Sequence, residues 1–255
     1  MRRIHFGQIP SHPKIWAIDD WSSKSQVERM QFLRKISEHA GLNPTLATLA
    51  VDIFKKYNVS PRDYKKQAEA LLHWVQNNIY YVNEPRERLQ EPTYTLRVGY
   101  GDCDDMTLLL AALCESVRLE YRFVLAGKIN GKVDRWIEGT PYKEGRWSHI
   151  YLIIGYPPFK PKKWVYAEPT IKTAKLGWDI VQAKNGILNM PELGATISGE
   201  EFGVRLIEPP KKKTVLSEIG EGLSLKKFVP AIVLGAITSV AIGELAAFIK
   251  RQIKN

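Results

Sequence analysis

The chain has 255 residues, of which 44% are hydrophobic and 25% are charged. This composition suits one large or two small domains with a core, and it excludes disorder of the whole chain and a collagen or coiled-coil repeat. The net charge of +10, of which residues 226–255 contribute +4, fits nucleic acid or an anionic lipid surface. Because no zinc-finger spacing and no aromatic RNA-binding signature occurs, we expect no specific nucleic-acid binding.

The N-terminal part predicts an irregular arm followed by helices. Residues 1–22 lack clear periodicity. Serines just after them supply caps for a helix that runs to about His39. Asn43-Pro44 opens a second helix and Ser60-Pro61 opens a third, because a capping residue followed by proline is a common helix start.

The middle of the chain predicts a loop, a buried helix and a sheet. Residues 83–100 hold several Pro and Gly residues and predict an extended loop, whereas residues 103–117 predict a strongly apolar helix. Runs rich in aromatic and β-branched residues predict strands at 121–125, 147–154 and 163–167. Residues 127–145 indicate a polar connection or a hairpin with its tip at Asn130-Gly131. Helices followed by antiparallel-type strands predict an α+β fold.

The two cysteines, Cys103 and Cys114, fall within the predicted helix. Their separation of eleven residues places them about 16 Å apart along its axis, too far for a disulfide. Two unpaired thiols indicate a reducing compartment. Residues 1–6 are basic but precede no apolar run, so we expect no secretory signal peptide.

The densest chemical signal is the segment Gly99-Tyr100-Gly101-Asp102-Cys103-Asp104-Asp105. A cysteine in the first turn of a helix lies at the positive end of the helix dipole, which favours the reactive thiolate. Asp102 and Asp105 have the spacing of a helix-capping pair. The charges of Asp104 and Asp105 oppose a thiolate, so a nucleophilic Cys103 needs a histidine partner.

His149 is the candidate for that partner. It lies in the alternating segment 147–153, and the following predicted strand leads to Glu168. If these strands pair as a hairpin, Glu168 approaches His149, orients its imidazole and stabilises the charged form. The same three residues could instead bind zinc, but one thiolate without a paired-cysteine motif argues against this, and we expect no metal. Cys114 lies on an apolar helix face and belongs to the core.

These segments together resemble the transglutaminase-like superfamily. Its cysteine, histidine and acid motifs are similar, in the same order, to residues 101–113, 148–151 and 167–170. A subgroup found in bacteriophage and prophage genomes is similar in two further places, Gln90-Glu91-Pro92 and Leu176-Gly177-Trp178.

The resemblance, which covers about residues 70–180, implies a papain-like fold with Cys103 as nucleophile, His149 as base and Glu168 as the orienting acid. Glu168 departs from the family, which usually has the shorter aspartate there. Backbone N–H groups at the helix start would bind the oxyanion. The further oxyanion and loop candidates are Gln90, Tyr100, Gly101 and Asp102.

The implied reaction is acyl transfer from an amide of a protein or peptide substrate, without a cofactor. Water as acceptor gives protease or amidase activity, and an amine gives transglutaminase-type cross-linking. The sequence does not choose between them. The alternative is a non-catalytic structural protein of a virion that retains the fold.

Residues 228–249 form an apolar stretch whose single charge is Glu244. As a helix this stretch spans about 33 Å, enough to cross a bilayer core of about 30 Å, although polar residues and Pro230 make insertion marginal. Small residues recur at every fourth position, namely Ala231, Gly235, Ser239, Gly243 and Ala247. This seam predicts packing against a second copy or a partner helix, in a membrane or in a protein assembly. A helix folded onto the body is the alternative.

We therefore expect four parts: an arm with helices at 1–60, a catalytic core at 61–182, a loop-rich extension and linker at 183–225, and a hydrophobic helix at 226–255. We expect the protein in the cytoplasm or associated with a virion, with membrane anchoring by the C-terminal helix left open.

Overall fold

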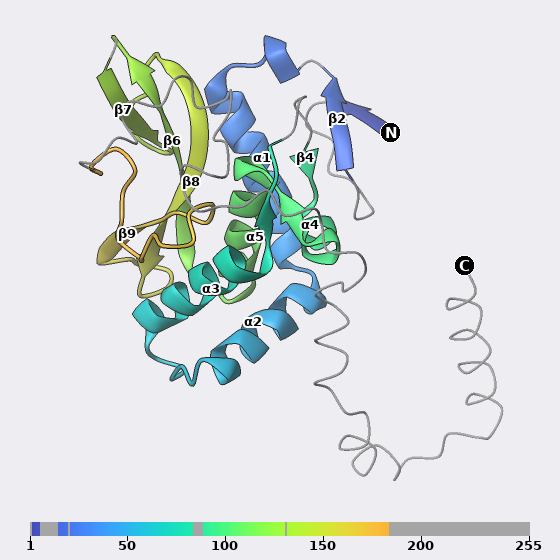
Figure 1. Cartoon of the computed structure of the whole chain (residues 1–255), viewed down its shortest axis with the longest axis vertical. Helices are drawn as coiled ribbons and strands as arrows, with labels where there is room; N and C mark the ends of the chain where they lie inside the picture. Colours follow the sequence, from blue (N-terminus) through green and yellow to red (C-terminus); the bar gives the residue numbers. More distant parts are fainter. Residues whose placement is uncertain (1, 6–14, 20, 84–88, 131, 184–255) are drawn as a thin grey trace, which may run out of the picture. The chain divides into compact units, whose positions relative to one another are not determined.

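The computed structural model describes residues 2–5, 15–19, 21–83, 89–130 and 132–183 (Figure 1). The chain divides into two compact units, Met1–Val215 and Leu216–Asn255, and the described residues all belong to the first. The predicted linker, the predicted C-terminal helix and its small-residue seam lie outside the described residues. Among the helices that are described, none combines the length and the apolar character needed to cross a bilayer.

The helices of the described residues follow the predicted order. They are α1 (Gln26–Gly41), α2 (Pro44–Lys56), α3 (Tyr64–Asn78), α4 (Pro92–Val98) and α5 (Cys103–Ser116), with a 3-10 turn at Trp21–Ser23 before them. The predicted first helix is confirmed, because Ser25 and Glu28 form a reciprocal capping box at the start of α1. The second is confirmed as well, with Asn43 accepting from the Thr45 N–H at 2.9 Å.

Two predictions in this region are wrong, one about where a helix begins and one about a loop. The third helix begins at Tyr64 rather than at Ser60-Pro61, because Asp63 caps it by accepting from the Lys66 N–H at 3.1 Å. The expected loop 83–100 contains α4, which starts with Pro92 at its first position. Proline is favourable there, since the N–H that it lacks has no partner inside a helix.

The main sheet has the strand order β7-β6-β8-β9 and is antiparallel throughout. Its strands are β6 (Glu120–Ile129), β7 (Lys132–Ile137), β8 (Arg146–Tyr156) and β9 (Lys163–Ala167). The predicted strands and the α+β class are confirmed. The hairpin alternative for residues 127–145 is also confirmed, because β6 pairs with β7 and Asn130 has the left-handed φ of 48° that asparagine tolerates in tight turns.

Two small sheets bring distant segments to the start of α5. The first joins β1 (Arg2–His5), β2 (Ile15–Asp19) and β4 (Leu89–Gln90), so the expected irregular arm contains strands. The second pairs β3 (Tyr80–Tyr81) in parallel with β5 (Tyr100–Gly101). These strands are two to five residues long and carry no readable alternation, which is why the sequence pattern did not predict them.

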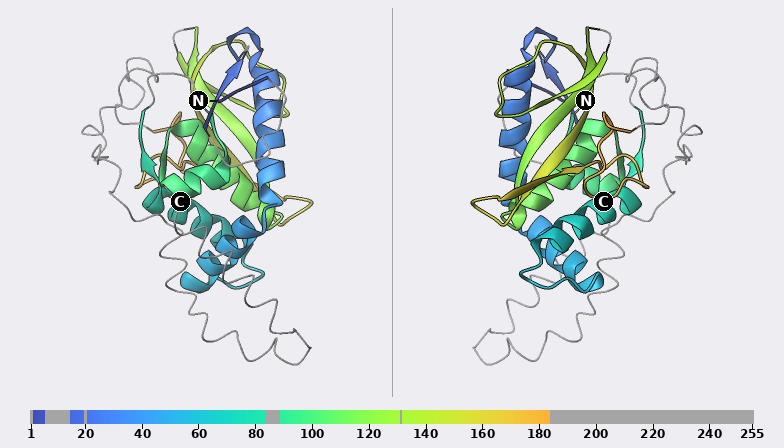
Figure 2. Two further views of the ribbon diagram at one scale, coloured as in Figure 1. Left: turned by 90° about the vertical axis from the view of Figure 1, so that its right-hand side faces the viewer. Right: turned by 90° about the vertical axis from the view of Figure 1, so that its left-hand side faces the viewer.

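Helix α5 is the centre of the fold. Every residue from Asp105 to Cys114 is buried, and α5 contacts α1, α2, α3, α4 and the main sheet (Figure 1). Cys114 is fully buried, as predicted. Helix α1 runs beside the sheet (Figure 2), where Arg34 forms a bidentate pair with Glu138. This packing fixes where the first turn of α5 meets the sheet.

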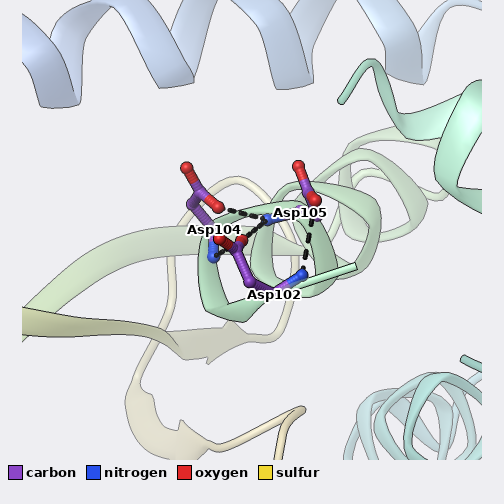
Figure 3. Close-up of side chains that lie close together, drawn as sticks. All are labelled: Asp102, Asp104 and Asp105. Carbon is purple, nitrogen blue, oxygen red and sulfur yellow. Dashed lines mark hydrogen bonds between the residues drawn. The ribbon is translucent and has the colours of Figure 1, made fainter. Parts of the chain in front are cut away.

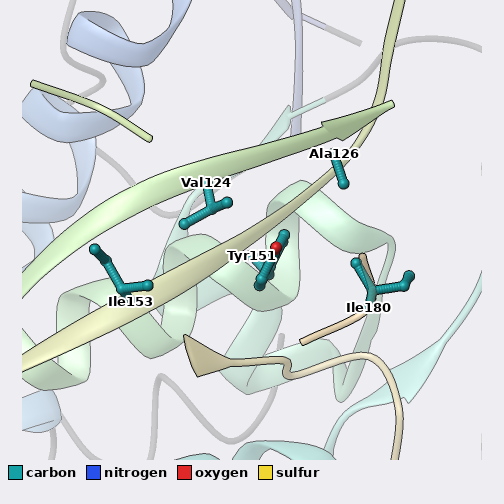
Figure 4. Close-up of a cluster of buried hydrophobic side chains, with 5 residues drawn as sticks. All are labelled: Val124, Ala126, Tyr151, Ile153 and Ile180. Carbon is teal, nitrogen blue, oxygen red and sulfur yellow. The ribbon is translucent and has the colours of Figure 1, made fainter. Parts of the chain in front are cut away.

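One face of the main sheet carries an apolar cluster (Figure 4). It consists of Val124, Ala126, Tyr151, Ile153 and Ile180. Ile180 comes from the segment after β9, so that segment covers this face of the sheet.

Candidate active site

The start of α5 is shaped by three aspartates (Figure 3). Asp102 Oδ1 accepts from the Asp104 N–H at 3.2 Å and the Asp105 N–H at 3.5 Å, and Asp105 Oδ2 accepts from the Asp102 N–H at 3.3 Å. The predicted capping pair is therefore confirmed. One ligand oxygen from each of the three lies within 4.8 Å of the others, and hydrogen bonds within this helix cap connect the three residues. The cap does not use the N–H of Cys103, for which the described residues show no acceptor.

Asp105 also ties the cysteine loop to β4. Its Oδ1 accepts from the Gln90 N–H at 2.7 Å, so one buried carboxylate joins the backbones of Gln90 and Asp102. Gly101 permits this approach, since a Cβ there would lie 2.6 Å from Asp105 Cβ. The structure thus brings together the loop candidates that the sequence singled out.

The side chain of Gln90 is buried, and the described residues offer it no hydrogen-bond partner. Its exposed fraction is 0%, and neither Nε2 nor Oε1 has a partner within the described part of the chain. A buried polar group left in this state costs about 1–3 kcal/mol. Gln90 therefore presents an amide donor and an amide acceptor beside the cysteine loop at a cost to stability.

His149 lies on β8 directly after a β-bulge. Ala126 of β6 pairs with His149 and Gly127 pairs with Trp147, so Ser148 is the extra residue. The bulge brings the chains so close that a Cβ on Gly127 would lie 2.0 Å from the Arg146 carbonyl oxygen. Bulges re-aim side chains at functional sites. Here the bulge sets the direction in which the His149 side chain leaves the strand.

Glu168 follows β9 and reaches His149. The register pairs Leu152 with Ala167, and its continuation places Glu168 opposite Tyr151 and diagonal to His149. His149 Nε2 and Glu168 Oε2 are 2.6 Å apart, and the two residues are 5% and 0% exposed. The longer side chain of glutamate therefore makes the contact. Since Nε2 faces Glu168, Nδ1 is the imidazole nitrogen left for a second partner.

Two further residues fix Glu168, one through its carboxylate and one through its backbone. Glu168 Oε1 accepts from the N–H of Thr170 at 2.9 Å and from its hydroxyl at 2.6 Å. From α3, Gln76 Nε2 reaches the backbone oxygens of Glu168, Ile171 and Ala174 at 2.8, 2.9 and 2.8 Å. The sequence analysis missed Gln76, because nothing in a helical pattern marks a buried glutamine as a clamp on a loop 92 residues away.

Cys103 and His149 meet through Ile150. The Ile150 N–H faces the Cys103 thiol. The carbonyl oxygen of Ile150 accepts at 3.0 Å from the hydroxyl of Thr107, which lies one turn further along α5 than Cys103. The half-buried Cys103 thus lies against the residue next to His149. Within the described residues no direct hydrogen bond joins the two side chains. Catalytic contacts of this kind often tighten only when substrate binds.

The pKa of the Cys103 thiol is raised well above its ordinary value. Burial is the largest cause, and the charges of Asp102 and Asp104 add to it, while the Ile150 N–H lowers the pKa by less. The direction is opposite to the one expected from the helix dipole, because desolvation of a thiolate outweighs the favourable backbone dipoles here. The thiol therefore carries its proton at neutral pH and needs a base to react.

Tyr81 is a neighbour of the site that the sequence analysis missed. Strand β3 places it opposite Gly101, and its pKa is raised by burial and then by the charges of Cys103 and Asp102. Tyr100, an expected oxyanion candidate, lies on the same small sheet opposite Tyr80.

Comparison with known proteins places part of the chain in a family. Residues 52–169 match the model of the transglutaminase-like superfamily. The chain contains a transglutaminase-like domain. The matched residues include Cys103, His149 and Glu168, so the predicted resemblance to this superfamily is confirmed, while the similarity to its phage subgroup stays a prediction.

A match to the chain is also found among solved structures. A chain from Cytophaga hutchinsonii, described as a "Putative Cysteine Protease", is 19% identical, with 50% of this chain and 37% of that chain covered and a TM-score of 0.35. The present chain thus spans little more than a third of that protein. No curated protein matches the sequence. The predicted four-part division of the chain stays a prediction.

Replacing Gly127 with alanine is expected to displace His149. The added Cβ meets the Arg146 backbone at 2.0 Å, so the bulge must rearrange and the contact with Glu168 is lost. We expect the chemical shifts of the His149 ring to change in NMR spectra. Gly145→Ala is the control, because its Cβ meets mainly the movable side chain of Ile129 at 2.8 Å. An unchanged His149 signal in Gly127→Ala would contradict this role of the bulge.

Alkylation of Cys103 by iodoacetamide, followed by peptide mapping, is expected to accelerate with pH well into the alkaline range. The raised pKa keeps the thiol protonated at pH 7, and only the thiolate reacts. Asp102→Asn keeps a good cap but removes a charge, so its rate at pH 8 should rise roughly threefold. Glu115→Gln at the other end of α5 is the control and should leave the rate unchanged. A rate that is already at its plateau at pH 6 would show a thiolate instead.

Proposed function

We propose that this protein is a thiol-dependent acyltransferase that acts on amide groups of proteins or peptides. Cys103 is the nucleophile, His149 the base and Glu168 the orienting acid. The transglutaminase-like domain supports a cysteine-based enzyme. The observation that carries the finer proposal is the buried contact between His149 and Glu168, next to the strand residue that faces the Cys103 thiol.

The reaction begins from a neutral thiol. As Cys103 Sγ attacks the carbonyl carbon, its proton passes to His149 Nδ1, and Glu168 stabilises the imidazolium that forms. The imidazolium then protonates the leaving amine, which leaves a thioester on Cys103. Water or a second amine attacks this thioester and regenerates the thiol. Water gives hydrolysis and an amine gives transamidation.

The developing oxyanion has two donors in this proposal. One is the N–H of Cys103, which the helix cap does not use. The other is Nε2 of Gln90, whose lack of a partner within the described residues supports a donor kept ready for substrate. Donors placed before the reaction stabilise the transition state without having to reorganise.

The test uses p-nitrophenyl acetate as a general acyl donor, because the natural substrate is not identified. We expect an acetyl adduct on Cys103, found by peptide mapping, and a burst of p-nitrophenol. Cys103→Ala should abolish the adduct, and His149→Gln should slow acylation by 10²-fold or more. Glu168→Gln should slow it less, since glutamine retains a hydrogen bond but no charge. Equal rates in wild type and His149→Gln would overturn the proposal.

Addition of hydroxylamine separates the two acceptors. Hydroxamate that forms with wild type in excess of the amount formed with Cys103→Ala shows that an amine enters the site, and an excess of acetate over that control shows that water does. Either outcome is acyl transfer through Cys103.

The second candidate is a non-catalytic structural protein, such as a virion component, that retains the fold. The raised pKa of Cys103 fits the unreactive thiol of such a protein as well as a thiol activated by a base. An inert Cys103 in the acylation experiment would support this candidate. Assembly through residues 228–249 stays a prediction for either function, and a chain truncated after residue 225 tests it by its oligomeric state.

Replacing Gln90 with methionine is expected to stabilise the protein while slowing acylation. Methionine has a similar length and removes two buried polar atoms that have no partner in the described residues, so the free energy of unfolding should rise by about 1–2 kcal/mol in urea denaturation. Acylation of Cys103 should slow by about 10²-fold, since an oxyanion donor is lost. Gln67→Met is the control, because Gln67 donates to the Pro61 carbonyl at 2.8 Å and its loss should destabilise. A less stable Gln90→Met variant with normal acylation would contradict the proposed role.

A further inference from the structure

We infer that Tyr151 and Asp179 are positioning residues that hold the plane of the His149 ring for proton transfer. The inference rests on the proposed function of His149. The rings of His149 and Tyr151 lie 5.8 Å apart at an interplanar angle of 18°, so they are nearly parallel. Both residues lie on the same face of β8, two positions apart.

A contact at one nitrogen does not by itself orient an imidazole. Glu168 fixes the position of Nε2, but the ring can still rotate about its Cβ–Cγ bond with only a small displacement of Nε2. That rotation would carry Nδ1 away from the thiol. A flat ring packed against His149 removes this freedom, and Tyr151 supplies that surface.

Tyr151 is itself fixed at its far end. Its hydroxyl donates to Asp179 Oδ1 at 2.8 Å, and the same oxygen accepts from the Val181 N–H at 3.2 Å. The other oxygen of Asp179 pairs with Arg135 of β7. Ile180, the residue next to Asp179, lies in the same cluster as Tyr151 (Figure 4). The segment after β9 thus anchors the tyrosine from the side remote from His149.

A second aromatic contact limits the sideways movement of Tyr151. Tyr166 of β9 lies 6.0 Å from Tyr151 by ring centroids, at an angle of 37°. The guanidinium of Arg135 lies 4.9 Å from the centre of the Tyr166 ring. Arg135 therefore contacts both Asp179 and Tyr166, and the two restraints on Tyr151 depend on each other.

The burial of Asp179 indicates more than fold stability. Asp179 is 4% exposed, and a buried ion pair is often no more stabilising than apolar residues of the same size. What such a pair provides is a directed contact that defines one arrangement. Here the directed contact ends on the hydroxyl of the tyrosine that packs on His149.

The test measures acylation of Cys103 by p-nitrophenyl acetate in the full chain. Tyr151→Phe keeps the ring but frees it from Asp179, and we expect acylation about tenfold slower; Tyr151→Leu removes the ring, and we expect about 10²-fold. The NMR signal of the His149 ring should keep its ring-current shift in Tyr151→Phe and lose it in Tyr151→Leu. Tyr156→Phe at the other end of β8 is the matched control, with no change expected, because its hydroxyl has no hydrogen-bond partner among the described residues. Melting temperatures identify variants that fail to fold.

A second pair of variants keeps the inference testable if Tyr151→Leu does not fold. Asp179→Asn retains an acceptor for the tyrosine hydroxyl and should retain more activity than Asp179→Ala. Acylation within twofold of wild type in both Tyr151→Phe and Asp179→Ala would overturn the inference. The proposed function would still hold in that case if His149→Gln is slow, and it would fall only if His149→Gln is as fast as wild type.

Discussion

The buried contact between His149 and Glu168 is the interaction on which the candidate site depends. A carboxylate with no exposed surface is costly unless donors surround it. Thr170 supplies two donors and His149 occupies the remaining oxygen. Gln76 then holds the backbone that carries the carboxylate, so α3 and the main sheet share one polar centre. Glu168 therefore fixes the position of His149 Nε2, because the acid itself is held in place.

The same packing determines the state of the nucleophile. Helix α5 runs through the core, so its first residue, Cys103, is partly withdrawn from water where it meets β8. Burial and the capping charges of Asp102 and Asp104 raise its pKa more than the backbone dipoles lower it. In the proposed mechanism the proton therefore leaves the thiol during the attack, so the position of the base matters more than it would for a resting thiolate.

Much of the fold was predictable because it follows from local interactions. Helix caps such as Ser25 and Asp102 act within three residues, and the strands of the main sheet show their pattern in single segments. The errors arose where local signals compete or are too short. Asp63 caps the third helix in place of the expected Ser60. Pro92 begins a helix within a segment whose other proline and glycine residues indicated a loop. The two-residue strands are too short to show a periodicity.

The sequence by itself determined the chemical inventory: a cysteine at a helix start, a histidine on a strand, an acid after the next strand, and the order of motifs that resembles a known superfamily. Only the tertiary structure decided how these groups are held. The bulge at Ser148 forms where β8 pairs with β6, and the Gln90 amide is buried beside the cysteine loop with no partner among the described residues. Gln76 binds the backbone of Glu168, and Asp179 binds Tyr151, so these contacts join residues far apart in the chain. Each depends on distances of a few ångströms across packed elements, and no spacing along a sequence specifies such distances.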